Sequence, residues 1–196
     1  MATPGELCNK TAELLGLQPN TTLIAWRALR EDQRVTTGGR GKSAAHCTPS
    51  DAASLLIATI GKMPLQSYLQ SWERFSGLTC TRLQQRRGRS VEELGGFNAG
   101  HSFQEGLTAL IASATSGSLQ GAYNPGSIRI GFLGPYPGAS IRLVGDIDAW
   151  IAYEELTASL PGLQPDGDGD LEQSKHITGK TIFGLGELLR RNGSSK

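Results

Sequence analysis

The chain has 196 residues, of which 38% are hydrophobic, 19% are charged and 26 are glycine, and its formal net charge is +1. This length suits one or two domains with a real core, and the glycine content predicts long loops. No apolar run reaches the roughly 18 residues that span a bilayer, which argues against a membrane partner. Three widely spaced cysteines, an odd number, favour a reducing cytoplasmic location over a disulfide framework.

Two short helices are predicted at the N-terminus. Thr3-Pro4-Gly5-Glu6 is typical of a helix start, because threonine caps, proline takes the first helical position and Glu6 can return a hydrogen bond. Gly16 ends this helix, and Gln18-Pro19 opens a second one that runs to about Glu31. The short connection between them is typical of a helix-turn-helix, whose second helix enters the major groove of DNA with its N-terminal turn.

The second helix carries the residues expected to contact DNA. Its first turn contains Asn20, Thr21 and Thr22, whose short polar side chains can reach base edges or phosphates. The N-terminus of a helix also favours a phosphate. Arg27 lies further along the same helix and adds a positive charge. We predict that these four side chains address the major groove.

A β-hairpin is predicted after the second helix. Residues 34–37 and 42–46 are interpreted as two short extended stretches around the glycine-rich turn Gly38-Gly39-Arg40-Gly41. Arg40 at the tip, followed by Lys42 and Ser43, is expected to touch backbone phosphate or to enter the minor groove. The sequence therefore predicts a cationic hairpin tip beside the polar helix tip.

A third helix follows this hairpin. Thr48-Pro49-Ser50-Asp51 repeats the capping pattern of residues 3–6 and opens a helix that ends near Ile60. The order helix, helix, hairpin, helix over residues 3–60 resembles a winged helix-turn-helix DNA-binding domain of bacterial and phage regulators. The resemblance implies double-stranded DNA as the ligand. It extends to these residues: Asn20, Thr21, Thr22 and Arg27 on the second helix, and Arg40, Lys42 and Ser43 on the wing.

The remaining residues predict a second, mixed unit that begins after a short joint at residues 61–64. An apolar stripe from Leu65 to Phe75 has helical spacing, which indicates a core helix or, alternatively, a subunit interface. The basic run Arg82–Arg89 is interpreted as a phosphate contact or flexible arm, with a plain exposed loop as the equal alternative. Basic residues are thus concentrated in the first 100 positions, where we expect any anionic partner to bind.

Further elements are predicted in the second half of the chain. Ser102-Phe103-Gln104-Glu105 is a capping box that opens a helix. Apolar residues alternate over 128–133 and again over 141–144, which predicts a β-hairpin. Residues 150–156 are expected to add a strand or a helix. A last helix is predicted at residues 181–191, although Gly184 and Gly186 weaken its pattern.

No pattern of catalytic or metal-binding residues emerges. Gly41-Lys42-Ser43 imitates the end of a P-loop, but position 36 is threonine where that motif needs glycine. The acidic loop Asp166–Asp170 lacks the glycine and glutamate that complete a calcium loop. His46 beside Cys47 has no second ligand pair for zinc. We expect no enzymatic activity and no cofactor or metal.

These features predict an α+β protein with a winged helix-turn-helix-like domain at residues 1–61 and a mixed helix and β-hairpin domain at residues 62–196 for oligomerisation or partner binding. The function expected is sequence-specific binding of double-stranded DNA by a cytoplasmic transcriptional regulator of bacterial or phage type. We expect a homo-oligomer, with a dimer favoured, in contact with the transcription machinery. The alternatives are a phage small terminase or replication subunit that recognises DNA for packaging, and a protein–protein adaptor that never touches DNA.

Overall fold

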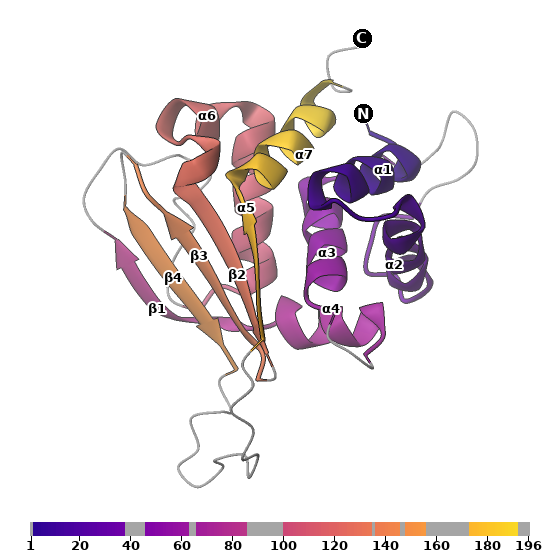
Figure 1. Cartoon of the computed structure of the whole chain (residues 1–196), viewed down its shortest axis with the longest axis horizontal. Coiled ribbons are helices and arrows are strands. Elements are labelled where there is room, and N and C mark those ends of the chain that lie inside the picture. Colours follow the sequence, from indigo (N-terminus) through magenta and orange to yellow (C-terminus); the bar gives the residue numbers. More distant parts are fainter. Residues whose placement is uncertain are drawn as a thin grey trace, which may run out of the picture.

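The structure, a computed structural model, describes residues 2–37, 46–62, 66–85, 100–134, 136–145, 148–155 and 173–191. Its elements are α1 (Pro4–Leu15), α2 (Pro19–Glu31), α3 (Pro49–Ile60), α4 (Tyr68–Ser76), β1 (Thr79–Gln85), α5 (Phe103–Ser116), α6 (Ser118–Ala122), the 3₁₀ helix η3 (Pro125–Ser127), β2 (Ile128–Gly134), β3 (Gly138–Leu143), β4 (Ala149–Glu154), β5 (Gln173–Thr178) and α7 (Gly179–Arg191). The chain is therefore an α+β protein, as predicted, with helices gathered on one side of an antiparallel sheet (Figure 1).

Capping boxes begin four of the helices. The boxes predicted at Thr3, Thr48 and Ser102 are confirmed, and α4 adds a fourth at Ser67. In each box the side chain at the cap accepts a bond from the backbone three residues on, and that residue's side chain accepts one in return. These hydrogen bonds to the ionised carboxylate lower the pKa of both Glu6 and Glu105.

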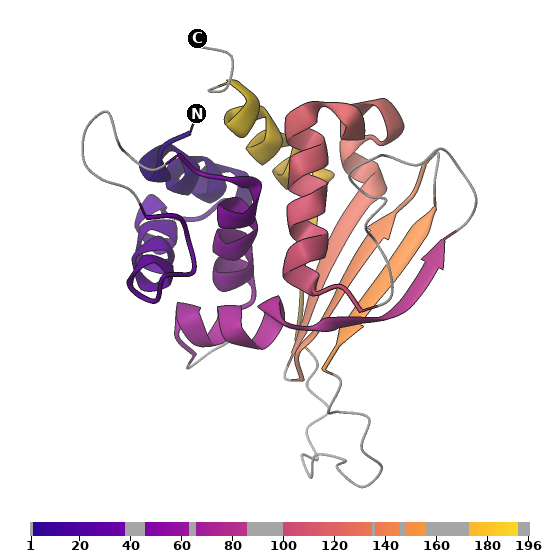
Figure 2. The same ribbon diagram turned by 180° about the vertical axis from the view of Figure 1, so that it is seen from behind.

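The sheet has five strands in the order β1-β4-β3-β2-β5, and every neighbouring pair is antiparallel. Side chains on β2, β3 and β4 alternate between buried and outward positions. Helix α5 covers the buried face; it lies behind the strands in Figure 1 and in front of them in Figure 2. The predicted hairpin at β2 and β3 is confirmed, and residues 149–154 form a strand. The edge strands β1 and β5 had not been predicted.

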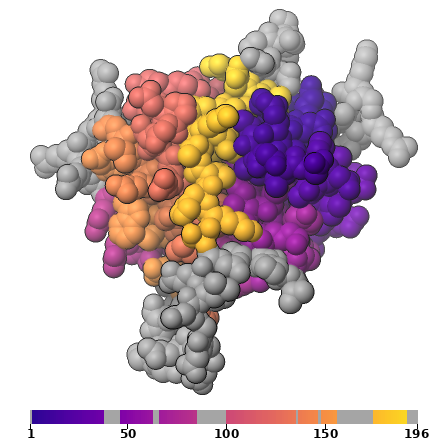
Figure 3. Space-filling model, in the orientation of Figure 1, coloured from indigo at the N-terminus to yellow at the C-terminus, as the bar shows by residue number. Residues whose placement is uncertain are grey.

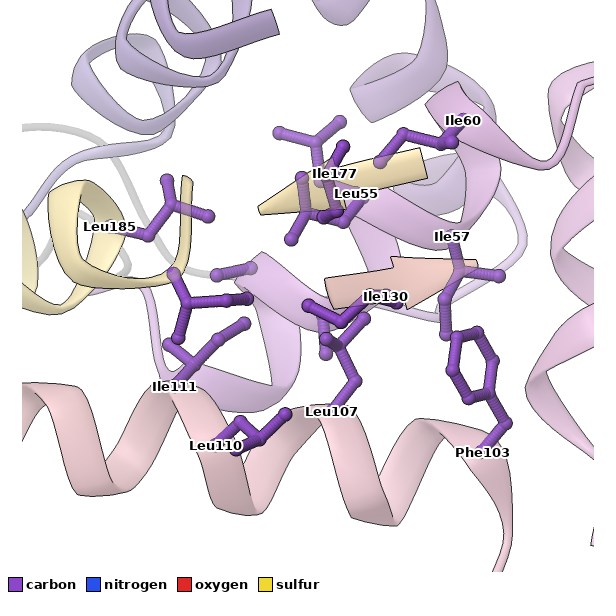
Figure 4. Packing of buried hydrophobic residues seen from close by; sticks show 14 of the residues in the cluster. Leu55, Ile57, Ile60, Phe103, Leu107, Leu110, Ile111, Ile130, Ile177 and Leu185 are labelled. Carbon is purple, nitrogen blue, oxygen red and sulfur yellow. The ribbon is translucent and has the colours of Figure 1, made fainter. Parts of the chain in front are cut away.

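Helix α3 lies at the centre of the molecule. All of its residues from Asp51 to Ile60 are buried, and Figure 4 shows Leu55 and Ile57 among side chains of α5, β2 and β5. One cluster of buried hydrophobic residues extends from Ala2 to Leu189. The predicted domain boundary at residue 61 therefore does not coincide with a break in the core.

Lys175 of β5 ties the sheet to the end of α3. Its side chain points toward the helices, and its ammonium group donates hydrogen bonds to the carbonyl oxygens of Ile60, at 3.1 Å, and of Lys62. A cation suits this position because the last carbonyls of a helix carry partial negative charge. Burial, and to a lesser extent the charge of Lys62, lowers the pKa of Lys175.

Helix α7 packs against both halves of the chain through two glycines. A Cβ atom on Gly186 would lie 2.5 Å from the Cβ of Ala114 in α5, and one on Gly184 would lie 2.8 Å from a methyl group of Leu14 in α1. The sequence suggested that these glycines weaken the helix; instead they permit its close approach to two neighbours. Figure 3 shows β5 and α7, in yellow, running between the N-terminal helices and the sheet.

We expect Gly186→Ala to lower the free energy of unfolding by about 1–3 kcal/mol, because the added methyl group meets backbone and side-chain atoms of Ala114. Gly5→Ala is the matched control: it lies in helix α1 and its Cβ would meet nothing within 4 Å. Helix propensity then makes it neutral or stabilising by up to about 1 kcal/mol. Denaturant unfolding measures both, and equal stabilities of the two variants would contradict the close packing of α7.

The lowered pKa values of Glu6 and Glu105 predict a pH effect. A carboxylate with a lowered folded pKa stabilises the protein above its unfolded pKa of about 4.3, and this stabilisation is lost as the pH falls through the folded pKa. The double variant Glu6→Gln/Glu105→Gln should therefore lose less stability than the wild type between about pH 5 and pH 3. Melting temperatures measured across this range test it; parallel pH profiles would contradict it.

Candidate nucleic-acid interface

The corner between α1 and α2 is rigidly defined by its backbone. Gly16 adopts a left-handed conformation with φ of 66°, and its N–H bonds the last carbonyls of α1. Pro19 occupies the start of α2, where its fixed φ suits the first turn of a helix. The short turn predicted from the sequence thus joins two helices, α1 and α2, with the bounds expected.

Thr22 holds these two helices together. Its side chain is completely buried, and its hydroxyl oxygen lies 3.0 Å from the carbonyl oxygen of Cys8 and 2.9 Å from that of Pro19. The prediction that Thr22 contacts DNA is therefore wrong. The reason is helical periodicity: Thr22 is on the same side of α2 as the buried residues Trp26 and Leu29.

The outward side of α2 presents a short row of side chains, which we call the α2 face: Asn20, Thr21, Ile24 and Arg27. Asn20, Ile24 and Arg27 are exposed, and Thr21 is half-buried. Positions 20, 24 and 27 lie four and three residues apart, so they follow one side of the helix. Ile24, 45% exposed, was missed in the sequence because an apolar residue in a helix is expected in the core.

The arginines of the N-terminal region differ in whether they are paired within the fold. Arg34 forms a 2.6 Å salt bridge with Asp32 and lies 4.7 Å from the centre of the Trp72 ring, so its charge is used within the fold. Arg27 and Arg30, both exposed, make no salt bridge within the described part of the chain. These two arginines of α2 are the ones available for an anionic partner.

The predicted wing is only partly within the described residues. Residues 34–37 do not form the predicted strand. Instead, the N–H of Thr36 donates a 2.7 Å hydrogen bond to the buried carboxylate of Asp51, at the start of α3, so this donor is not used to pair with another strand. Arg40, Lys42 and Ser43 lie outside the described residues, as do Arg86–Arg89 and the acidic loop Asp166–Asp170.

A second charged surface lies on the outward side of the sheet, which we call the open face. It includes Arg82, Arg129, Arg142 and Trp150, all exposed. Arg129, Arg142 and Trp150 were not selected from the sequence, although each lies between two apolar residues that are buried, which marks it as outward. Arg82, predicted in a loop or arm, is instead part of β1.

The thiols do not provide a nucleophile at this corner. Burial raises the pKa of Cys8 to about 11 and, with a contribution from the charge of Asp51, that of Cys47 to about 12. Both thiols are therefore protonated near neutral pH. A protonated thiol is a poor nucleophile and a poor metal ligand.

Comparisons with known proteins give no relatives: no protein-family model, curated protein or solved structure matches the chain. Among the helices of the described residues, none is long and apolar enough to cross a membrane. Within the same residues, no group of three or more histidine, cysteine, aspartate or glutamate side chains could hold a metal ion. The function must therefore be inferred from the surfaces themselves.

Thr21 and Thr22 offer a matched pair for testing the geometry of α2. Thr22→Val should lower the free energy of unfolding by about 1–2 kcal/mol, because it leaves the buried carbonyl oxygen of Cys8 without its hydroxyl partner. Thr21→Val removes a hydroxyl from the surface and should change stability by less than about 0.5 kcal/mol. Denaturant unfolding compares the two, and the reverse order of stabilities would contradict this orientation of α2.

Proposed function

We propose that this protein binds double-stranded DNA in a sequence-specific manner through the α2 face, as a transcriptional regulator of bacterial or phage type. The observation that carries the proposal is the composition of that face. Asn20 offers an amide suited to adenine, Ile24 an apolar surface suited to the methyl group of thymine, and Arg27 a guanidinium suited to guanine. A helix that presents all three in one row has the chemistry of base readout.

The start of α2 adds a phosphate-binding element. The cap residue, Gln18, makes no side-chain capping bond, unlike the caps of α1, α3, α4 and α5. Pro19 has no N–H and the N–H of Thr21 bonds the carbonyl of Gln18, so the N–H of Asn20 and the partial positive charge of the helix N-terminus are what this end offers to a phosphate group. Arg27 follows two turns further along α2, and Arg30 lies in its last turn, so both can reach the DNA backbone that flanks the bases being read.

The proposal retains the expectation that Arg40, Lys42 and Ser43, which follow α2 in the chain, contact the phosphate backbone of the DNA. It also keeps a dimer, because one short helix with two available arginines gains affinity when two half-sites are bound together. Native mass separates the regulator from the packaging alternative. A dimer supports regulation, whereas a ring of many copies supports a small terminase subunit.

A protein–protein adaptor is the second candidate, and the exposed apolar residues favour it. Leu17 is 39% exposed in the turn before α2, and Ile24 is 45% exposed on α2. Apolar side chains of this kind also suit a protein interface. Under this alternative, Ile24→Glu abolishes partner binding, and Arg40→Glu/Lys42→Glu leaves it intact.

The primary test is selection from a random-sequence duplex pool with the full-length chain, followed by titration of the enriched duplex at several salt concentrations. With four to six phosphate contacts per dimer, the slope of log K against log[salt] should be about −4 to −5. No enrichment, or binding that is independent of salt, would contradict the proposal.

Arg27→Ala should weaken binding of the selected duplex by about 1–3 kcal/mol, which is about 5-fold to 150-fold, because it removes a base contact and a positive charge. Lys180→Ala is the control: Lys180 is exposed on α7 and carries the same charge. It should leave the affinity nearly unchanged. Fluorescence anisotropy measures both affinities, and equal losses in the two variants would show that only net charge matters.

A further inference from the structure

The open face of the sheet carries a cross-strand row of polar and aromatic residues. On the register of the strands, Arg129 of β2 faces Arg142 of β3, which in turn faces Trp150 of β4. Thr178 of β5 and Gln84 of β1 extend this row on either side. Since neighbouring strands lie about 4.8 Å apart, Arg129 and Trp150 are about 10 Å apart across β3.

The pairing of Arg129 with Arg142 is unfavourable in the free protein. Like charges directly opposite each other on neighbouring strands repel and destabilise a sheet. No salt bridge joins either side chain to a carboxylate within the described residues. The acidic side chain that shares this face in the described strands is Glu154, opposite Gly138. An anion bound between the two guanidinium groups would relieve the repulsion.

An aromatic hollow lies next to this row. It has a volume of about 500 Å³, and its lining includes Trp150, Tyr136, Leu133, Arg82 and, at the end near the β2–β3 turn, the acidic residues Glu154 and Glu155. Trp150 is 37% exposed and Tyr136 is 55% exposed. The guanidinium group of Arg82 lies 5.6 Å from the centre of the Trp150 ring, within the range of a cation–π contact. The hollow thus offers an exposed aromatic surface beside a positive charge.

The charge and the aromatic surface together select the ligand. We propose that the open face binds a single-stranded nucleic acid, with Arg129 and Arg142 holding backbone phosphates and a base stacking on Trp150 in the hollow. Proteins that bind single strands combine a basic track for the backbone with aromatic side chains for the bases. In a duplex, stacking between neighbouring base pairs covers the faces of the bases, so this surface discriminates against double-stranded DNA. The site is separate from the α2 face and does not depend on the function proposed for it.

The test uses the full-length chain and fluorescein-labelled oligothymidylate or oligouridylate of about 20 nucleotides, long enough for one such site. The variant Arg129→Gln/Arg142→Gln should weaken binding at least tenfold and make the salt slope shallower by about 1.4, the value for two lost phosphate contacts on a single strand. Binding should also quench tryptophan fluorescence in the wild type. Trp150→Leu should weaken binding and abolish this quenching, because Trp26 and Trp72 lie outside the site.

Two controls show whether the loss of binding belongs to the open face alone. Arg27→Ala, on the α2 face, should leave single-strand binding unchanged, and the two open-face variants should leave duplex binding unchanged. The melting temperature of Arg129→Gln/Arg142→Gln at low salt should equal or exceed that of the wild type, because a repulsive pair has been removed; this also shows that the variant folds.

Four results would overturn the proposal, and the first three concern single strands and an acidic competitor. These are no binding of either oligonucleotide by the wild type, equal affinities in the wild type and the open-face variants, and preferential displacement by polyglutamate, which would identify an acidic protein segment as the occupant. A duplex that competes for the open face as strongly as a single strand would also contradict it, because stacking on Trp150 requires an unpaired base.

Discussion

The complete burial of α3 is the constraint on which the rest of the structure depends. From Asp51 to Ile60 every residue is buried, so the helix needs neighbours on all sides. Most of its residues are apolar, and the polar residues Asp51, Ser54 and Thr59 are buried with them, which is typical of a helix in the middle of a core rather than at its surface. The N-terminal helices, α4 and α5 provide those neighbours, and Lys175 provides a partner for its last carbonyls. The sheet and the N-terminal helices consequently share one core.

This central helix also explains why the predicted boundary at residue 61 does not match the packing. Gly61, taken in the sequence as part of a joint between domains, is itself buried, and a Cβ atom there would lie 2.9 Å from the ring of Phe75. The predominance of apolar residues in α3 was visible in the sequence. Its partners α5 and α7, however, come from distant segments of the chain, so no local pattern shows that every side of the helix is covered.

Local sequence signals predicted most of the helices well. The edge strands were not predicted, because they depend on pairing with strands that are distant in the sequence. Capping boxes at Thr3, Thr48 and Ser102 located helix starts because their hydrogen bonds lie within four residues. The strands β1 and β5 are largely polar and lie at the two edges of the sheet, so their alternation was too weak to recognise. They exist because β4 and β2 offer them hydrogen bonds, which no local pattern reveals.

In the candidate sites, too, some features could be predicted from local sequence and others depend on distant segments. Thr21 and Thr22 are chemically identical neighbours, and only their positions relative to Trp26 and Leu29 decide that Thr22 is buried. That periodicity was present in the sequence. By contrast, the facing of Arg129 by Arg142 depends on the register of β2 against β3, which the lengths of the strands alone do not fix.

The two proposed surfaces differ in how their residues relate to the stability of the fold. On the α2 face, the polar groups are simply outward, and the helix is held by Thr22 and the buried residues behind it. On the open face, Arg129 and Arg142 repel each other, so the free protein gives up some stability at a place where a bound anion restores it. Residues kept at such a cost are commonly those that bind a ligand. For this reason the arginine pair, although absent from any sequence motif, is stronger evidence of a ligand than an isolated exposed arginine of α2.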